Sequence, residues 1–290
     1  MPNLDATVPH IARVYDYWLG GKDNFAADRE LGERTLAAYP NLVFSVRANR
    51  AFLARTVRFL TAEAGIRQFL DIGTGIPTAN NTHEVAQRAA PECRIVYVDN
   101  DPVVLLHAKA LLKSTPQGAC AYIDADLRDP ETILAKAAET LDFTKPVAVM
   151  LISVLHFIGD DAEADAIVHR VTDACAPGSF VTISHVASDI DAEQQTEMVR
   201  RLNQSVAEKA TMRDRAGVTR LFAGLELAEP GVVGVSDWRP DSGLEAARPT
   251  GLRGGVARSV RCLCDRLRHQ RPAHSPGLRL LAGRQGQFRR

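Results

Sequence analysis

A glycine-containing turn follows a short apolar stretch and is a candidate ligand-binding loop. Its sequence is Asp71-Ile72-Gly73-Thr74-Gly75-Ile76-Pro77. Glycines let the chain turn tightly and let a ligand approach the backbone, because no Cβ stands in the way. A helix that follows such a turn offers unpaired N–H groups and the positive end of its dipole. The alternative is a plain tight connection between a strand and a helix.

The residues around these glycines disfavour a dinucleotide. A dinucleotide loop has a third glycine where this chain has Thr78, so that a diphosphate can reach the helix. Pro77 removes one N–H donor, and the Asp71 carboxylate suits a cationic ligand. An NAD-dependent enzyme is therefore the weaker hypothesis. Acid-x-Gly-x-Gly is the loop pattern of methyltransferases, whose donor S-adenosylmethionine carries a sulfonium and no phosphate.

Two further acids end the next predicted strands. Asp99 follows Ile95–Val98, a place where a carboxylate can accept both hydroxyls of a ribose. Asp101-Pro102 has the pattern of a helix start, which leaves Asp99 as the ribose ligand. Asp126, at the tip of the third strand, would accept the adenine amino group, with a solvated loop acid as the alternative. Three acids at three successive strand ends predict one donor site.

The fourth strand leads into Ser153-Val154-Leu155-His156-Phe157. This edge would border the transferred methyl group. His156 is the candidate proton acceptor, because an imidazole titrates near neutral pH. The alternative is a structural histidine whose ring is satisfied beside the core. His185, at the end of the fifth strand, is a weaker candidate.

The N-terminal segment 13–25 combines aromatic residues, a Gly-Gly break and a polar tip. One interpretation is an amphipathic helix capped at Gly20. The other is a lid whose tip closes on donor or substrate, in which case Tyr17, Lys22 and Asn24 would contact the substrate.

Hydrophobic periodicity predicts the elements that position these residues. Residues 9–62 have the three-to-four spacing of helices, and Arg47-Ala48-Asn49-Arg50 is expected on an exposed helix surface, with a contribution to the site as the alternative. Strands are expected at 68–70, 94–98, 121–123, 147–152, 180–184, 225–228, 232–236 and around 255–257. Helices are expected near 79–89, 102–113, 130–141 and 161–174, and within 191–223. Such alternation predicts a parallel sheet with helices on both faces.

The composition bounds the class of protein. The chain has 290 residues, 46% of them apolar, and a formal net charge of zero, so no overall field indicates a nucleic-acid or membrane partner. Val147 to Ile158, the longest apolar run, is too short to span a bilayer. The N-terminus has no signal pattern, and the five scattered cysteines do not form a disulfide framework. We therefore predict a soluble cytoplasmic protein without a membrane partner.

The C-terminal stretch differs from the rest of the chain. Residues 248–290 contain eleven arginines and one acid, whereas residues 1–247 are net acidic. Cys262, Cys264, His269 and His274 have the residue types of a zinc site, but structural zinc sites place two to four residues between paired cysteines, and here there is one. No metal site is predicted. A nucleic-acid-binding arm is disfavoured, because no aromatic residues alternate with the arginines.

The sequence as a whole resembles an actinobacterial family of S-adenosylmethionine-dependent methyltransferases long catalogued as a domain of unknown function. The resemblance rests on Pro9–Asn24, Arg47–Arg50, Asp71–His83, Trp238–Pro240 and Gly254–Arg258, and it covers about residues 8–258. It implies a class I methyltransferase fold with seven strands, the last antiparallel. It also implies donor contacts at Asp71, Gly73, Gly75, Asp99 and Asp126. With their neighbours Thr74, Asn100 and Leu127, and with Ser153 after the fourth strand, these form a predicted donor site of nine residues.

These observations predict three segments: a helical lid (1–62), a methyltransferase domain of the Rossmann-like α/β class (63–258) and an arginine-rich tail (259–290) that is disordered or a sequence artefact. The predicted function is transfer of a methyl group from S-adenosylmethionine to an unidentified small molecule. The alternative is a non-catalytic regulatory module that binds S-adenosylmethionine or a nucleotide. Such a module would fill the space beside Ser153 with Tyr15 or Tyr17.

Overall fold

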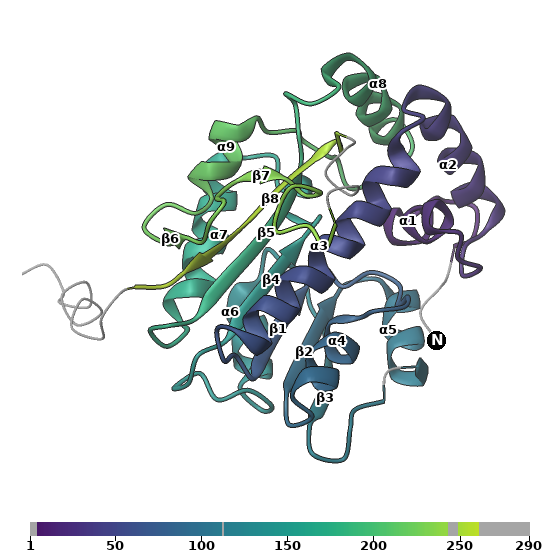
Figure 1. Cartoon of the computed structure of the whole chain (residues 1–290). Coiled ribbons are helices and arrows are strands. Elements are labelled where there is room, and N and C mark those ends of the chain that lie inside the picture. Colours follow the sequence, from purple (N-terminus) through teal and green to yellow (C-terminus); the bar gives the residue numbers. More distant parts are fainter. Residues whose placement is uncertain (1–4, 112, 243–248, 261–290) are drawn as a thin grey trace, which may run out of the picture. The chain divides into compact units, whose positions relative to one another are not determined.

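One mixed sheet organises the computed structural model, which describes residues 5–111, 113–242 and 249–260 (Figure 1). Within those residues the sheet has eight strands in the order β3-β2-β1-β4-β5-β8-β6, and β7 also pairs with β8. They are β1 (Gln68–Ile72), β2 (Arg94–Asp99), β3 (Ala119–Asp124), β4 (Ala148–Ile152), β5 (Phe180–Val186), β6 (Glu226–Leu227), β7 (Val233–Gly234) and β8 (Leu252–Arg258). Strands β1 to β5 are parallel and β8 is antiparallel to β5, which confirms the predicted fold class.

Helices connect the parallel strands, as the alternating pattern predicts. The connecting elements are α4 (Thr82–Ala89), α5 (Pro102–Leu111), α6 (Pro130–Ala137), and the 3-10 turn η1 (Leu155–Phe157) with α7 (Asp161–Asp173). Three helices precede β1, namely α1 (Ile11–Leu19), α2 (Ala26–Ala38) and α3 (Leu42–Ala62), and two follow β5, namely α8 (Ala192–Asn203) and α9 (Arg215–Arg220). Asp129 begins α6 by accepting a hydrogen bond from the backbone N–H of Thr132, and Asp160 begins α7 through Glu163. Each carboxylate satisfies an N–H group that the helix leaves unpaired.

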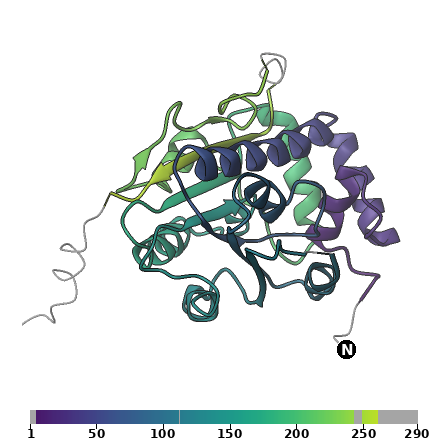
Figure 2. The same cartoon turned by 60° about the horizontal axis from the view of Figure 1, so that its bottom comes forward.

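The sheet has an apolar layer on each face, because successive strand residues point to opposite sides. Leu70 and Val96 belong to the layer formed with α6, α7 and α9, whereas Phe69 and Ile95 belong to the layer formed with α3 and α4. Figure 2 shows α3 running along its face of the sheet. Helices therefore cover both faces, as predicted.

The strand order reverses beside β1. Strands β2 and β3 extend the sheet on one side of β1, and β4 and β5 extend it on the other. The connections that leave β1 and β4 therefore diverge, which opens the crevice where open α/β sheets bind ligands. In the register of the sheet, Asp99 lies opposite Asp124, and Asp71 lies opposite Tyr97. The acids that end β1 and β2 thus lie at the same edge.

The first two helices pack with α8. Their apolar cluster includes Val14, Trp18 and Leu31 on the N-terminal helices and Met198 and Leu202 on α8. The start of α3 joins this cluster through Leu42 and Val46, whereas the rest of α3 packs against the sheet. Within the predicted lid segment 1–62, α1 and α2 are therefore the elements placed to act as a lid, a role that stays a prediction.

The antiparallel end of the sheet has one strand more than the predicted seven. The stretches predicted as strands at 225–228 and 232–236 reduce to β6 and β7, both paired with β8. A turn separates them, in which the Gly231 N–H donates to the Ala228 carbonyl and Gly231 has a φ of 81°. The turn divides the edge into two short strands. The predicted last strand around 255–257 is confirmed and is longer than predicted.

Among the described residues, no helix has both the length and the hydropathy needed to cross a lipid bilayer. The cytoplasmic location stays a prediction. The arginine-rich tail, with the residue types that were weighed for zinc, lies outside the described residues from position 261 onward.

Candidate functional site

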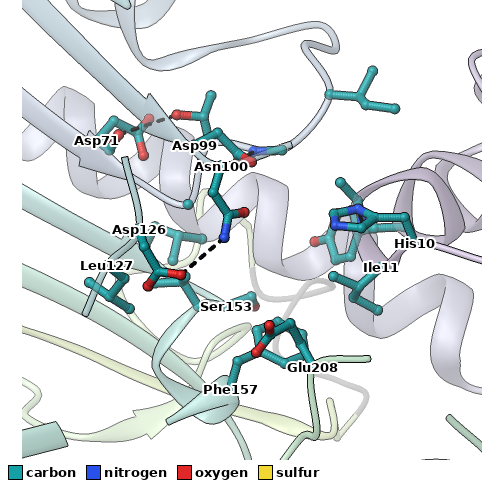
Figure 3. Close-up of a pocket in the computed structure, with 18 of the residues that line it drawn as sticks. His10, Ile11, Asp71, Asp99, Asn100, Asp126, Leu127, Ser153, Phe157 and Glu208 are labelled. Carbon is teal, nitrogen blue, oxygen red and sulfur yellow. Dashed lines mark hydrogen bonds between the residues drawn. The ribbon is translucent and has the colours of Figure 1, made fainter. Parts of the chain in front are cut away.

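A cavity of about 160 Å³ opens at the carboxyl edge of the sheet (Figure 3). All nine residues of the predicted donor site line it: Asp71, Gly73, Thr74, Gly75, Asp99, Asn100, Asp126, Leu127 and Ser153. We call this space the acidic cavity, because three of the nine carry carboxylates. Residues from four strand ends meet here, since parallel strands bring their carboxyl ends to a common edge.

The loop after β1 bends back onto β2. Its Gly73 N–H donates to the Val98 carbonyl at 2.8 Å, and its Gly75 N–H donates to Asp99 Oδ2 at 2.8 Å. Gly73 and Gly75 have φ values of 77° and 65°, a region that favours glycine. A Cβ on Gly73 would lie 2.4 Å from Val154 Cγ2. The backbone conformation and the close approach together explain why glycine is needed at position 73.

Asp71 is buried at the base of the acidic cavity. Asp71 is 4% exposed, and its Oδ2 accepts a hydrogen bond from Thr82 Oγ1 at 2.6 Å. Burial raises the pKa of this carboxyl group to about 6, although the hydrogen bond from Thr82 and the charge of Arg50 act in the opposite direction. The group therefore changes its charge just below neutral pH.

Asp99 and Asp101 have the two different positions that the sequence predicts. Asp99 lines the cavity, and its Oδ1 accepts the N–H of Asp101 at 2.9 Å. Burial raises its pKa above the ordinary value. Asp101 instead starts α5, where it accepts the N–H of Val103 at 2.8 Å and lies 2.7 Å from His10 Nδ1. Asp99 is thus the carboxylate that faces the cavity.

Asp126 lies across the cavity in a polar cluster that the sequence only partly indicates. Asn100 Nδ2 donates to its Oδ2 at 3.3 Å (Figure 3). Arg128 follows two residues later and donates to Glu208 Oε2 at 3.0 Å and to the Phe157 carbonyl at 3.1 Å. Arg128 and Glu208 also line the cavity. No sequence signal identified them, because both lie in irregular loops without periodicity.

Ser153 is held at the cavity wall by a buried network. Asn49, which is 1% exposed, donates to Ser153 Oγ at 2.9 Å and to Tyr15 Oη at 3.1 Å, and it accepts from Ser184 Oγ at 2.7 Å. Ser153 has a φ of 52°, an uncommon conformation for a residue with a side chain. The expectation of an exposed helix surface is thus correct for Arg47 and wrong for Asn49, which packs toward the sheet edge.

Replacing Asn49 by alanine is expected to lower the free energy of unfolding by about 1–3 kcal/mol, because Ser184 and Ser153 then lose buried partners. Urea denaturation measures this change. Arg47→Ala is the matched control on the same helix, and it should stay within about 0.5 kcal/mol of the wild type because Arg47 is exposed. Equal effects of the two substitutions would contradict the role of the network.

With this geometry in place, comparison with known proteins identifies the family. A family model described as S-adenosyl methyltransferase matches residues 1–260. The chain belongs to the S-adenosyl methyltransferase family. Two solved structures are similar to it over nearly their whole lengths. The first, a DUF574-family protein from Streptomyces avermitilis, is 42% identical with a TM-score of 0.85 and covers 89% of this chain and 100% of its own.

The second similar structure is a protein from Thermobifida fusca that is proposed to be a methyltransferase. It is 42% identical with a TM-score of 0.82 and covers 90% of this chain and 98% of its own. A search among curated proteins found no match. The predicted family, fold and methyl-donor cofactor, S-adenosylmethionine, are confirmed.

In this methyltransferase-family chain, the candidate base His156 does not line the acidic cavity. It lies on η1, is 6% exposed, and lines a second cavity of about 70 Å³. Burial, together with nearby His185 and Arg213, lowers its pKa well below the ordinary range, so the imidazole is neutral at pH 7. Its Nδ1 has no hydrogen-bond partner among the described residues.

His185 packs beside His156 and has a hydrogen-bonding partner for each ring nitrogen. Its Nδ1 is 2.9 Å from the Val186 carbonyl and its Nε2 is 2.7 Å from Arg213 Nη1, so both nitrogens are engaged. The alternative of a satisfied structural histidine therefore fits His185 and does not fit His156. The catalytic role of His156 stays a prediction.

The three predicted substrate contacts do not reach either cavity. Tyr17 Oη lies 3.4 Å from Glu33 Oε1, Asn24 donates to Asp16 Oδ2 at 2.8 Å, and Lys22 is exposed. The residues of α1 that do line both cavities are Ile11 and Tyr15. The helical repeat of 3.6 residues explains the difference, because residues two apart lie on different sides of a helix.

The second cavity adjoins the acidic cavity. Ile11, Tyr15, Ser153 and Phe157 line both spaces, so these four residues form the boundary between them. The other side chains around the second cavity are mostly apolar and come from α1, α3, α8 and the strand ends of β5 and β8. We call this space the apolar cavity.

Proposed function

We propose that this protein is an enzyme that transfers the methyl group of S-adenosylmethionine to a small-molecule acceptor. One observation carries the proposal: a cavity lined by all nine predicted donor residues shares a wall with a separate apolar cavity. A donor site alone serves a sensor as well as an enzyme. A second space beside Ser153 is what an acceptor requires.

The acidic cavity suits S-adenosylmethionine in charge. Besides the three carboxylates of the donor site, Asp16 and Glu208 line it, whereas its basic residues are His10 and Arg128. The guanidinium of Arg128 is already engaged with Glu208. Such a cavity favours a ligand with cationic groups and disfavours a diphosphate, which supports the donor over NAD.

When bound, S-adenosylmethionine supplies a methyl carbon on a cationic sulfur: the acceptor's lone pair forms the new bond, the C–S electron pair stays on sulfur, and the acceptor's proton leaves to a base or water. The residues of the protein itself contribute by positioning the acceptor. Ser153, Tyr15 and Phe157, at the boundary of the two cavities, would orient the acceptor, and enclosure would exclude water. The neutral imidazole of His156 is the proposed proton acceptor.

A non-catalytic regulatory module is expected to have a tyrosine side chain in the space beside Ser153. Neither Tyr15 nor Tyr17 fills the space beside Ser153: Tyr15 lies at its boundary, and the ring of Tyr17 packs near Gly32, away from both cavities. This arrangement supports the enzyme over a non-catalytic module.

Calorimetry on the full-length protein tests the proposal. S-adenosylmethionine and S-adenosylhomocysteine are expected to bind, and NAD is expected to give no heat under the same conditions. Methyl transfer is then measured by incubating the protein with S-adenosylmethionine and candidate acceptors and quantifying S-adenosylhomocysteine. Absence of heat with both adenosyl ligands would overturn the proposal, as would preferential binding of NAD.

Donor binding is expected to weaken as the pH falls through 6. The Asp71 carboxyl group has its pKa at about 6, so its ionised fraction falls from nearly complete at pH 7.5 to about one tenth at pH 5. The ammonium group of S-adenosylhomocysteine is expected to bind the ionised Asp71 carboxylate. Affinity for S-adenosylhomocysteine should therefore drop about tenfold over this range. Calorimetry at the two pH values measures it. Asp71→Asn should bind weakly and lose this dependence; an unchanged slope in Asp71→Asn would assign the titration to another group.

A further inference from the structure

The walls of the apolar cavity carry no formal charge. None of the residues that line it, all within the described part of the chain, is Asp, Glu, Lys or Arg. His156 is the lining residue whose side chain would titrate near pH 7 in water. Burial lowers its pKa, so the imidazole carries no charge at pH 7. Moving a charged group into such a space removes its hydration without supplying a partner, which is strongly unfavourable. The cavity therefore disfavours carboxylates, phosphates and ammonium groups.

Aromatic and aliphatic side chains supply most of the surface. Tyr15, Trp18 and Phe157 contribute rings, and Met198 and Leu202 contribute aliphatic chains from α8. By the same measure the space is less than half as large as the acidic cavity, about 70 Å³ against about 160 Å³. The occupant is therefore smaller than the donor and mainly apolar.

Two buried polar atoms in the lining residues have no partner among the described residues. They are Gln195 Oε1 and His156 Nδ1, in residues that are 2% and 6% exposed. The amide of Gln195 is fixed, because its Nε2 donates to the Gly251 carbonyl at 2.6 Å. Its oxygen is consequently an acceptor without a donor, which is unfavourable for a buried polar atom.

The other polar groups of the lining are satisfied. Tyr39 Oη donates to Asp191 Oδ2 at 3.0 Å, and Ser45 Oγ donates to the Asn41 carbonyl at 3.1 Å. The unpaired atoms are thus confined to Gln195 and His156 among the side-chain polar atoms that line this space. A ligand that satisfies Gln195 must bring a hydrogen-bond donor, an O–H or N–H group.

We propose that the apolar cavity is the acceptor site and that its substrate class is a small, uncharged, mainly apolar molecule with an O–H or N–H group, of which an alkylphenol is the simplest example. The inference rests on the proposed function, since it names the acceptor for that reaction. On binding, the O–H or N–H group donates a hydrogen bond to Gln195 Oε1; when the new bond to the methyl carbon forms, the proton leaves to His156 or water, as in the proposed function. The wall shared with the acidic cavity places the molecule next to the donor.

Binding of three matched probes to the full-length protein, saturated with S-adenosylhomocysteine, tests the inference. The probes are 4-methylphenol, toluene and 4-methylbenzoate. Their binding is measured by calorimetry or ligand-observed NMR. We expect 4-methylphenol and toluene to bind, and 4-methylbenzoate to bind at least a hundredfold more weakly. Binding of 4-methylbenzoate as tight as that of 4-methylphenol would overturn the inference.

Two variants locate the probes. Gln195→Met keeps the size of the side chain without the hydrogen-bond acceptor. It should weaken the binding of 4-methylphenol by about fivefold to tenfold and leave the binding of toluene unchanged. Ala210→Leu fills part of the cavity and should weaken the binding of both probes. Equal loss of 4-methylphenol and toluene in Gln195→Met, or no loss in Ala210→Leu, would contradict the site.

Binding of S-adenosylhomocysteine in the same samples reports on folding and on the proposed function separately. Both variants should keep wild-type affinity for it, because neither residue lines the acidic cavity. If the wild type does not bind it, the proposed function fails. If the wild type binds it and 4-methylphenol does not bind, only the acceptor inference fails.

Discussion

Replacing Asp99 by alanine is expected to weaken the binding of S-adenosylhomocysteine by about 1–3 kcal/mol, or about 5-fold to 150-fold. Asp99 ends β2 at the acidic cavity, where its oxygens accept the N–H groups of Gly75 and Asp101. In the proposed function, the remaining lone pairs of this carboxylate accept the ribose hydroxyls. The substitution removes the proposed ribose ligand and also leaves the Gly75 N–H of the loop without its carboxylate partner. Calorimetry measures the change in dissociation constant.

Asp124→Ala is the matched control for this experiment. Asp124 ends the neighbouring strand in register with Asp99, but it is exposed and does not line the acidic cavity. Its substitution should leave the affinity unchanged. A similar loss in both variants would point to a general effect of charge, and no loss in Asp99→Ala would remove Asp99 from the donor site.

Gly73→Ala is expected to lower the free energy of unfolding by about 2–5 kcal/mol. The left-handed backbone conformation costs an L-residue about 1–2 kcal/mol, and forcing a methyl group into a packed space adds about 1–3 kcal/mol. The space is filled because the new Cβ would lie 2.6 Å from Val154 Cβ, an atom that cannot rotate away. Urea denaturation with and without S-adenosylhomocysteine measures the loss.

Gly75→Ala separates the two contributions. Gly75 also has a positive φ, 65°, but a Cβ there would meet no atom within 4 Å. We therefore expect only the backbone contribution, about 1–2 kcal/mol. If the two substitutions destabilise the protein equally, the contact with Val154 is not what requires glycine at position 73.

The residues that line the acidic cavity could be predicted from the sequence because their signals are local. An acid before two glycines, and acids after the next two apolar stretches, are visible along the chain. Asp-Pro pairs mark helix starts, which separates Asp99 from Asp101 without a structure. Once alternation predicts a parallel sheet, the strand ends must share one edge, so all nine residues meet at one cavity.

The apolar cavity could not be predicted in this way. Whether Asn49 is exposed or buried depends on which face of α3 packs, and a helix with apolar residues on several sides does not reveal this. The same holds for α1, where Tyr15 lines both cavities and the predicted Tyr17 lines neither. Gln195 lies far from the motifs in the chain and carries no signal of its own.

What the sequence determined by itself is therefore the fold class, the family resemblance and the carboxylate positions, because each depends on local backbone preference and on the short-range order of strands and helices. Tertiary packing decided the rest. It buried His156 away from the acidic cavity, left its Nδ1 and Gln195 Oε1 without partners, and formed the apolar cavity from helices distant in the chain. Contacts between distant segments depend on the shapes of the packed faces, and hydrophobic periodicity records only that a face is buried, not which partner buries it.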